Sequence, residues 1–298
     1  MKETARRRPP GPSSRAAPVP ACYAIAVEQR RIPSTGELLP VIGLGTWQTF
    51  DVDASERARA PLADVLRGLF AAGGSVIDSS PMYGRAEQVT GDLLAQLGDS
   101  PRPFLATKVW TRGKAQGIAE MERSLARLRT PVVDLMQVHN LLDWQTHLPT
   151  LRAWKAAGKI RYLGITHYAH SAFDDLERLM RTERVDFVQL PYSLADREAE
   201  KRLLPAARDL GVAVLVMRPM AEGALFARVR GRELPSWAAD FDCTSWASFF
   251  LKFVLAQPAV TAPIPATSRP EHAAQNLAAG TGRLPDAPTL RRMIEQVG

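Results

Sequence analysis

The sequence contains four side chains whose chemical types could together carry out a proton transfer. They are Asp78, Tyr83, Lys108 and His139. A phenol has a pKa of about 10, which is too high for an efficient acid or base at neutral pH. A neighbouring ammonium favours the phenolate and lowers the pKa of the phenol, and a carboxylate can hold that ammonium in a buried place. A histidine can donate a hydrogen bond to a substrate oxygen. The set suits proton delivery to a carbonyl that receives hydride from another source.

Each of the four residues also has an ordinary structural interpretation. Lys108 alone would be a solvated lysine, and Asp78 would be a helix cap. Tyr83 would be a core aromatic, and His139 would be a histidine whose nitrogens are satisfied by neighbours. The chemical interpretation therefore depends on whether the elements that carry these residues bring them to one place.

These elements follow a regular alternation from Val41 onward, in which short apolar runs precede stretches of helical periodicity. The apolar runs are continuous rather than alternating, which is typical of parallel strands covered on both faces. We predict strands at residues 41–45, 75–78, 104–109, 133–139, 162–166, 187–191, 213–218 and 262–265. We predict helices at residues 61–73, 86–98, 117–129, 146–158, 172–183, 198–211, 244–257 and 270–280.

Eight strands, each followed by a helix, predict a single α/β domain with the (β/α)8 TIM-barrel fold over residues 23–298. A doubly wound sheet is the alternative, but it normally carries GxGxxG after its first strand, and GLGTWQ at 43–48 lacks the third glycine. Residues 30–40 predict an N-terminal β-hairpin that plugs the bottom of the barrel.

In such a barrel the active site lies at the carboxyl ends of the strands. Asp78 ends the second strand and Tyr83 follows in its loop, while Lys108 and His139 end the third and fourth strands. We therefore expect the four side chains to meet in one pocket. The apolar walls and the orienting group of this pocket are predicted to be Trp47, Met82, Trp110 and His139.

Seven motifs in order give the chain a resemblance to the aldo-keto reductases, from about residue 31 to residue 277. They are GLGTW (43–47), VIDSSPMYGRAE (76–87), LATKVW (105–110), VDLMQVHN (133–140), GKIRYLGIT (158–166), DFVQLPYS (186–193) and IPATSRPEHAAQN (264–276). The resemblance implies a barrel that binds NADP(H), rather than NAD(H), without a Rossmann fold. It also implies that Tyr83 is the general acid or base, with Lys108, Asp78 and His139 completing the catalytic set.

The resemblance also implies cofactor contacts. Gln189 matches a carboxamide-binding glutamine, and Thr166-His167 stands where the family usually has Ser-Asn. Met217-Arg218 stands where an aromatic residue usually covers the nicotinamide, so that either side chain is a candidate for covering the ring, and Arg218 is alternatively a pyrophosphate contact. The other candidate cofactor contacts are Thr46, Trp47, Gly223, Thr267, Ser268, Arg269, His272 and Asn276.

Residues 268–271 predict a capping box at a helix start, with Ser268 as the cap and Glu271 as its partner. A helix N-terminus beside Arg269 is a good site for the 2′-phosphate of NADP(H). The lysine that is frequent in the family just after Ile-Pro is Ala266 here, which weakens the expected preference for NADP(H) over NAD(H).

The composition narrows the classes of partner and the cellular location that we expect for this protein. The net charge is +7, but much of the excess lies in residues 1–22, which are rich in Arg, Pro and Ser and are predicted to be disordered. Without a nucleic-acid-binding motif, a run of about 18 apolar residues or a zinc-ligand spacing, we expect no nucleic acid, membrane or metal as a partner. Because no apolar stretch follows Arg6-Arg7-Arg8, a cytoplasmic location is favoured over a periplasmic one.

The predicted function is reduction of an aldehyde or ketone to an alcohol, or the reverse reaction. The alternatives are a cofactor-binding regulatory protein of the same fold, an aldolase that forms a Schiff base at Lys108, and a nucleic-acid-binding protein that uses the basic segment. The sequence leaves the small-molecule carbonyl substrate and the oligomeric state open.

Overall fold

The computed structural model describes residues 26–98 and 101–297, and the predicted disordered segment 1–22 lies outside these ranges. Eight strands form one parallel sheet in which each strand pairs with its neighbours in chain order. These strands are β3 (Leu44–Gly45), β4 (Val76–Asp78), β5 (Phe104–Val109), β6 (Val133–His139), β7 (Ile160–Thr166), β8 (Phe187–Pro191), β9 (Ala213–Met217) and β10 (Ala262–Pro263).

The sheet closes on itself between its first and last strands. The Gly43 amide donates to the Pro263 carbonyl, and the Gly45 amide donates to the Pro265 carbonyl. A Cβ atom at residue 45 would lie 2.7 Å from the Ile264 carbonyl oxygen, so this seam needs glycine. The closed barrel confirms the predicted (β/α)8 fold and excludes the doubly wound sheet.

The two strands at the seam are shorter than predicted. We expected strands at 41–45 and 262–265, but β3 and β10 have two residues each. Two of the four residues at 262–265 are prolines, which have no amide hydrogen to donate to a neighbouring strand. The backbone ladder at the seam is correspondingly brief.

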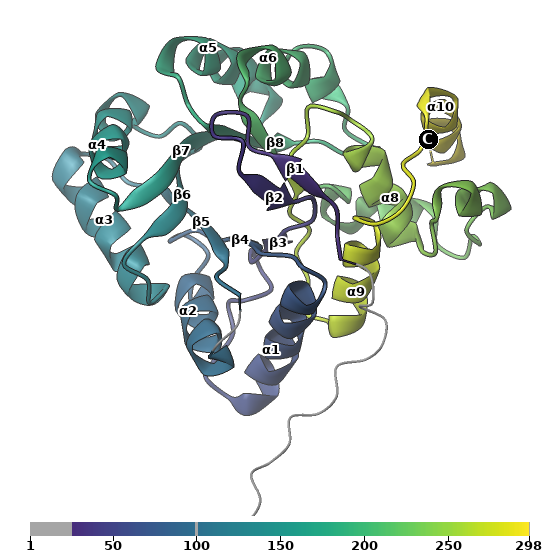
Figure 1. Cartoon of the computed structure of the whole chain (residues 1–298), viewed down its shortest axis with the longest axis horizontal. Coiled ribbons are helices and arrows are strands. Elements are labelled where there is room, and N and C mark those ends of the chain that lie inside the picture. The colour runs from purple at the N-terminus through teal and green to yellow at the C-terminus, as the bar shows by residue number, and fades with distance from the viewer. Residues whose placement is uncertain (1–25, 99–100, 298) are drawn as a thin grey trace, which may run out of the picture.

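The helices surround the strands as an outer ring (Figure 1). They are α1 (Glu56–Ala71), α2 (Ala86–Leu97), α3 (Lys114–Arg127), α4 (Trp144–Ala156), α5 (Phe173–Glu183), α6 (Leu203–Leu210), α7 (Ala224–Arg228), α8 (Trp246–Leu255), α9 (Pro270–Ala278) and α10 (Ala287–Val297). The first helix begins five residues before the predicted start at Pro61, because the Ser55 hydroxyl accepts a hydrogen bond from the Ala58 amide and caps the helix there. Helices α7 and α10 were not predicted.

Helix α9 begins at the predicted Pro270, but the capping box predicted at its start is wrong. The capping box at 268–271 does not form, because α9 begins at Pro270 and its N-cap is Arg269, which makes no side-chain capping bond. The Arg269 amide instead donates to the Thr267 hydroxyl, 3.1 Å away. Proline suits the first helical position because its missing amide hydrogen would have had no partner there.

The predicted hairpin is present and closes one end of the barrel. Strands β1 (Gln29–Arg31) and β2 (Leu38–Pro40) pair antiparallel, and Figure 1 shows them crossing the centre of the ring. Ile32 and Leu39 are fully buried among the apolar side chains that fill the barrel interior. The Arg30 guanidinium donates to the carbonyls of Leu255 and Val260, which ties the hairpin to the end of α8. The hairpin does not cover the opposite end of the barrel, where the strands terminate, so a functional site can lie there.

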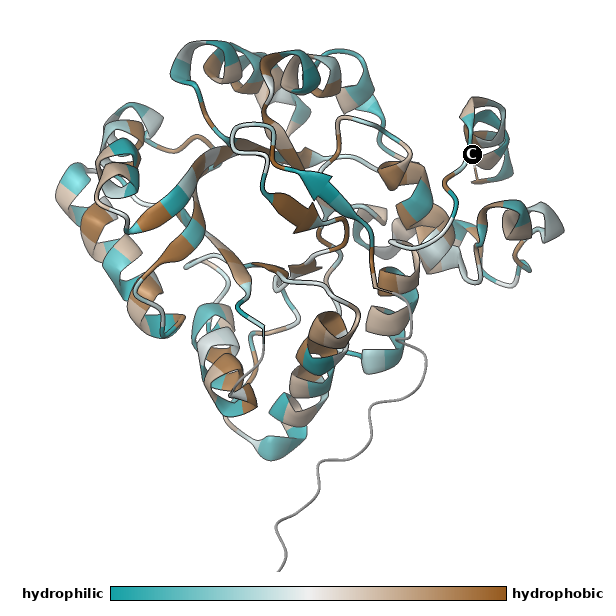
Figure 2. Cartoon of the chain, viewed as in Figure 1, coloured by the Kyte–Doolittle hydropathy of each residue, from teal (hydrophilic) through white to brown (hydrophobic). Residues whose placement is uncertain are grey.

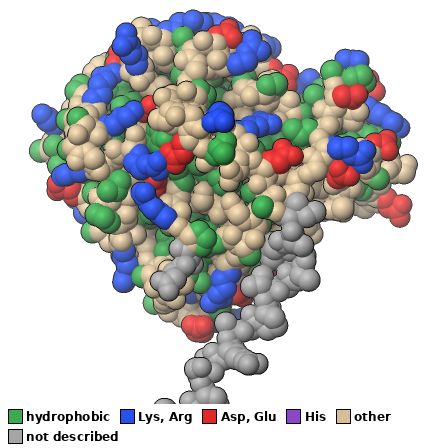
Figure 3. Space-filling model, in the orientation of Figure 1, with side chains coloured by type: hydrophobic (Ala, Val, Ile, Leu, Met, Phe, Trp, Pro, Cys, Tyr) green, Lys and Arg blue, Asp and Glu red, His purple; other side chains and the backbone are tan. Residues whose placement is uncertain are grey.

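Hydrophobic residues concentrate on the strands, and the helices alternate between hydrophobic and hydrophilic residues (Figure 2). The exception is α8, where nine of ten residues are buried and seven of these nine are apolar, the other two being Ser248 and Lys252. On the face that carries the hairpin, acidic and basic side chains are interspersed (Figure 3).

Across residues 26–98 and 101–297, no helix has the length and apolar character needed to cross a membrane.

Candidate active site

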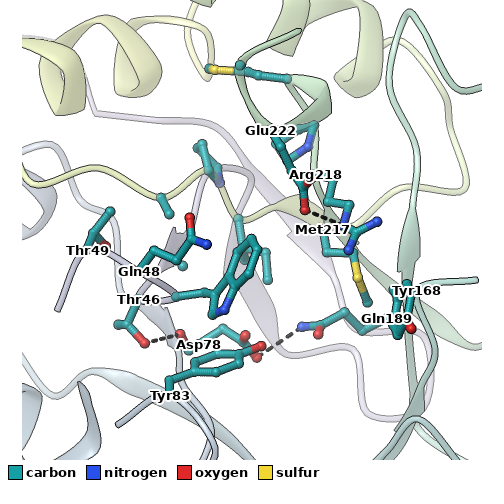
Figure 4. A pocket seen from close by; sticks show the side chains of 18 of the residues that line it. Thr46, Gln48, Thr49, Asp78, Tyr83, Tyr168, Gln189, Met217, Arg218 and Glu222 are labelled. Atoms are coloured by element: carbon teal, nitrogen blue, oxygen red, sulfur yellow. Dashed lines mark hydrogen bonds and ion pairs between the residues drawn. The ribbon is translucent and has the colours of Figure 1, made fainter. Parts of the chain in front are cut away.

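A cavity of about 480 Å³ lies at the carboxyl ends of the strands (Figure 4). Its walls include Asp78 and Tyr83 from β4 and its loop, His139 from β6, Gln189 from β8 and Met217 from β9. Elements far apart in the sequence therefore contribute polar groups to one concave space, which is where a barrel places its active site.

A buried ion pair forms the floor of this site. The Lys108 ammonium donates to Asp78 Oδ2 at 2.6 Å and to the Ser79 carbonyl at 2.8 Å, and its side chain is completely buried. Burial is the largest single influence on the pKa of Lys108 and lowers it, but Asp78 and Tyr83 together outweigh burial, so this pKa lies above its ordinary value. Lys108 is therefore a protonated, positively charged group at neutral pH.

Tyr83 lies directly beside this cation. The Lys108 nitrogen is 5.1 Å from the centroid of the Tyr83 ring. We expected the ammonium to lower the pKa of the phenol, but burial has the larger effect, and the pKa of Tyr83 is raised despite the opposing attraction of Lys108. This expectation was wrong in its net direction because the cavity wall shields the phenol from water. Tyr83 is a neutral phenol at physiological pH and can act as a proton donor.

His139 approaches Tyr83 from β6, which is separated from β4 by β5 in the sheet. The two rings meet edge to face with centroids 6.1 Å apart, and the Ser80 hydroxyl lies 3.1 Å from His139 Nδ1. Burial, followed by repulsion from Lys108, lowers the pKa of His139 to about 3. The imidazole is therefore neutral at physiological pH. With Ser80 donating to Nδ1, the ring would carry its proton on Nε2 and could donate to a substrate oxygen.

This lowered pKa predicts a pH dependence of stability. The unfolded chain binds a proton at His139 below about pH 6.5, whereas the folded protein does not, so stability falls as the pH falls. At pH 5 the loss relative to pH 8 amounts to about 2 kcal/mol from this residue. Urea unfolding of His139→Gln at the two pH values should show a correspondingly weaker acid destabilisation, with His272→Gln, an exposed histidine, as control. Equal acid sensitivity of wild type and His139→Gln would contradict the neutral, buried histidine.

The predicted apolar walls surround the mouth of the cavity. Trp47 and Met82 line it directly, and each is 40% exposed. Trp110 does not line the cavity but contacts its edge, with its ring centroid 6.1 Å from that of His139. The Trp110 amide donates to Glu120 on α3, which fixes the start of this loop.

Of the three residues predicted to contact the carboxamide, only Gln189 lines the cavity. Gln189 lines the cavity, but its Nε2 donates to Asp78 Oδ1 at 3.0 Å and its Oε1 accepts from the Thr166 hydroxyl. Thr166 is buried behind Gln189 and does not line the cavity. The Nδ1 atom of His167 accepts from the Ala169 amide, and its ring stacks on that of Tyr168, which lines the cavity where His167 does not. The structure therefore does not bring Thr166 and His167 to the cavity surface.

The loop after β9 forms the wall opposite Tyr83. Arg218 binds Glu222 at 2.9 Å, and its guanidinium carbon lies 5.0 Å from the centroid of the Tyr168 ring. Arg218 and Glu222 have φ angles of 54°, and Gly223 has a φ of 91°. Such angles are costly for non-glycine residues and often accompany functional sites. Met217, Arg218 and Gly223 all line the cavity, as do Thr46 and Trp47.

A second cavity of about 550 Å³ adjoins the first, because Gln48 and Thr49 line both. Ser268 and Arg269 line this second cavity at the start of α9. Thr267 and Asn276 are buried beside it and face a small separate space, whereas His272 is exposed and lines none of these cavities. Arg218 lines the first of these two adjoining cavities, and Arg269 lines the second.

The polar residues missed in the sequence include two that contact the catalytic candidates, besides Gln48, Thr49, Tyr168 and Glu222 in the cavity wall. Ser80 contacts His139, and Gln137 donates to Asp78 Oδ1 at 3.2 Å. Gln137 stands two residues before His139 on one strand, so the twofold alternation of strand side chains would have placed it on the same inward face. In the described ranges, no group of three or more His, Cys, Asp and Glu side chains could hold a metal ion.

The fold and this site define a TIM barrel whose carboxyl-terminal end holds a cavity lined by Asp78, Tyr83 and His139, beside the buried Lys108. A family model described as the aldo/keto reductase family matches residues 41–289. The chain therefore belongs to the aldo/keto reductase family of oxidoreductases.

Known relatives share this family but differ in their cofactors. The aldo-keto reductase YhdN of Bacillus subtilis (strain 168) is 27% identical over 218 residues, which cover 68% of this chain and 65% of that protein. The NADH-specific methylglyoxal reductase of Escherichia coli (strain K12) is 25% identical over 89% of this chain and 98% of its own length. An aldo/keto reductase from Klebsiella pneumoniae, solved in complex with NADP and acetate, has a TM-score of 0.75 at 27% identity, covering 88% and 93% of the two chains.

Proposed function

We propose that the protein reduces an aldehyde or ketone to an alcohol with NADP(H), and catalyses the reverse reaction, using Tyr83 as the general acid or base. The observation that carries this proposal is the position of a neutral phenol beside the buried Lys108–Asp78 pair at the floor of a cavity. A phenol in this place can give up its proton because the neighbouring ammonium stabilises the phenolate that remains.

The other residues orient the substrate and keep water out. The neutral His139 ring donates a hydrogen bond from Nε2 to the same oxygen that receives the proton from Tyr83. Trp47, Met82 and Trp110 give the mouth of the cavity an apolar rim that favours a carbonyl compound over bulk water. Asp78 holds Lys108 in place and does not exchange a proton with the substrate.

The shape and charge of the two adjoining cavities fit a dinucleotide. An elongated, phosphate-bearing molecule requires cations along its path, and Arg218 and Arg269 stand in the first and second cavity. When bound, the dinucleotide supplies the hydride. Met217, Arg218, Gly223 and Gln189 would hold it in the first cavity, and Ser268 and Arg269 would hold its 2′-phosphate in the second.

The alternative activities have weaker physical support. A Schiff-base aldolase needs a neutral amine that can attack a carbonyl, but Lys108 is completely buried, ion-paired and protonated. A purely regulatory role would leave the phenol and its cation without a use. A cytoplasmic location and the absence of a nucleic-acid partner remain predictions.

Comparing the binding of NADPH and NADH tests directly whether Arg269 contacts the 2′-phosphate. Replacing Arg269 with Ala should weaken NADPH binding by about 1.5–3 kcal/mol, the usual cost of losing a hydrogen bond to a charged group. NADH lacks the 2′-phosphate, so its binding should change little. Titration of both nucleotides against tryptophan fluorescence measures the two affinities.

The control for this test is Arg67→Ala, because Arg67 is an exposed arginine on α1 that does not line the second cavity. Arg67→Ala should leave both affinities unchanged. An equal loss for NADPH and NADH in Arg269→Ala would mean that Arg269 is structural, and no loss for NADPH would remove it from the phosphate site. Thr267, Ser268 and His272 would then be the candidates.

A further inference from the structure

A second glutamine supports Asp78 from inside the barrel. Asp78 Oδ1 accepts from Gln189 Nε2 at 3.0 Å and from Gln137 Nε2 at 3.2 Å, while Oδ2 accepts from Lys108 at 2.6 Å. Gln137 and Lys108 are register partners on adjacent strands, and both side chains are fully buried. Two amide groups thus hold one carboxylate oxygen, and the ammonium holds the other.

The backbone opposite Gln137 makes room for this arrangement. Gly164 on β7 is the register partner of Gln137, and a Cβ atom there would lie 3.1 Å from Gln137 Cγ. It would also lie 3.0 Å from the Phe187 carbonyl oxygen, which is part of the backbone and cannot rotate aside. The methyl group of an alanine at residue 164 would therefore crowd the Gln137 side chain and displace it from its present position beside Asp78.

The orientation of Gln137 leaves one of its own atoms unsatisfied. Gln137 Oε1 is buried without a hydrogen-bond partner. An ionised carboxylate can only accept hydrogen bonds, so the amide nitrogen of Gln137 must face Asp78 and the oxygen must face away. A buried acceptor without a donor is unfavourable, and a group of this kind in a native protein calls for a reason.

We propose that Gln137 is a positioning residue that, together with Gln189, keeps the Asp78 carboxylate drawn back from Tyr83, so that the positive charge of Lys108 remains available to the phenol. This inference rests on the proposed function for its catalytic meaning. The charged and titratable groups around Tyr83 are Asp78 on β4, Lys108 on β5, His139 on β6 and Arg218 after β9. Of these, Asp78 is the one that Gln137 contacts.

Removal of the Gln137 donor should let Asp78 neutralise Lys108 more completely. Asp78 raises the pKa of Tyr83 and Lys108 lowers it, so the loss of this donor should raise the pKa of Tyr83 further. We expect a rise of about one unit in Gln137→Met, which keeps the volume and loses the donor. The alkaline limb of kcat for carbonyl reduction should move upward by the same amount, because reduction requires the protonated phenol.

The titration of the Tyr83 phenol can be followed by ¹⁹F NMR of protein in which difluorotyrosine replaces tyrosine. The difluorinated phenol is more acidic, so it titrates at a pH at which the protein is still folded. The Tyr83→Phe variant assigns the resonance. The control is Leu135→Met, which changes an inward-facing residue of the same strand. Gly164→Ala, which displaces Gln137 without removing it, should shift the Tyr83 resonance in the same direction and serves if Gln137→Met does not fold.

The result that supports the inference is an upward shift in Gln137→Met and Gly164→Ala, with none in Leu135→Met. An unchanged Tyr83 titration in folded Gln137→Met, or an equal shift in Leu135→Met, would overturn it. The NMR measurement needs no substrate and no turnover. A protein that reduces no carbonyl would therefore refute the proposed function alone, whereas active protein with an unchanged titration would refute the role of Gln137 alone.

Discussion

Tyr83→Phe is expected to lower kcat for carbonyl reduction by about 10²–10⁴-fold, the usual contribution of a positioned general acid. The substitution removes one oxygen atom and keeps the ring that packs against His139. NADPH affinity and thermal stability should therefore remain close to those of the wild type. Initial rates of NADPH oxidation, fluorescence titration and thermal unfolding measure the three quantities.

Tyr168→Phe is the matched control for this variant. Tyr168 lines the same cavity, but it is 48% exposed and lies on the opposite wall beside Arg218. Its loss of a hydroxyl should change kcat by no more than a few-fold. A Tyr83→Phe enzyme that retains a rate within a few-fold of wild type would show that Tyr83 is not the proton donor.

Lys108→Met is expected to impair both catalysis and folding. Without the ammonium, the phenolate of Tyr83 has no adjacent cation, and kcat should fall about a hundredfold or more. Asp78 would also be left as a buried carboxylate that has lost its charged partner, which typically costs about 3–5 kcal/mol of stability. Steady-state kinetics and urea unfolding of the purified variant test the two effects separately.

The double variant Asp78→Asn/Lys108→Met separates the structural effect from the chemical one. Neutralising both partners should restore much of the lost stability and none of the lost rate. As a control, Lys201→Met removes an exposed lysine paired with Glu198 and should cost at most about 1 kcal/mol. Recovery of activity in the double variant would contradict the role of Lys108 as the cation beside Tyr83.

The barrel and the meeting of its polar strand ends could be predicted from the sequence because both follow from local patterns. Continuous apolar runs before helical stretches specify parallel strands, and the ends of such strands lie on one rim. Asp78, Lys108 and His139 each stand at or within one residue of a strand end, so their grouping needed no knowledge of packing.

Features that depend on tertiary packing were not predictable in the same way. The net pKa shift of Tyr83 reflects a balance between burial and a charged neighbour, and only the depth of the cavity decides it. His167 turns away because its ring finds the Ala169 amide and the Tyr168 ring. The capping box at Ser268 fails because Pro270 sets a later helix start than the Ser-x-x-Glu pattern indicates.

The most direct test of the central claim is the transfer of deuterium from NADPH labelled at nicotinamide C4 to a carbonyl substrate. A panel of aldehydes and ketones is incubated with the protein, and the products are analysed by mass spectrometry. Our account predicts an alcohol that carries one deuterium on its carbinol carbon, formed in equal amount to the NADPH consumed, with Tyr83→Phe forming almost none. Carbonyl turnover without consumption of NADPH, or a substrate adduct trapped on Lys108 by borohydride, would contradict it.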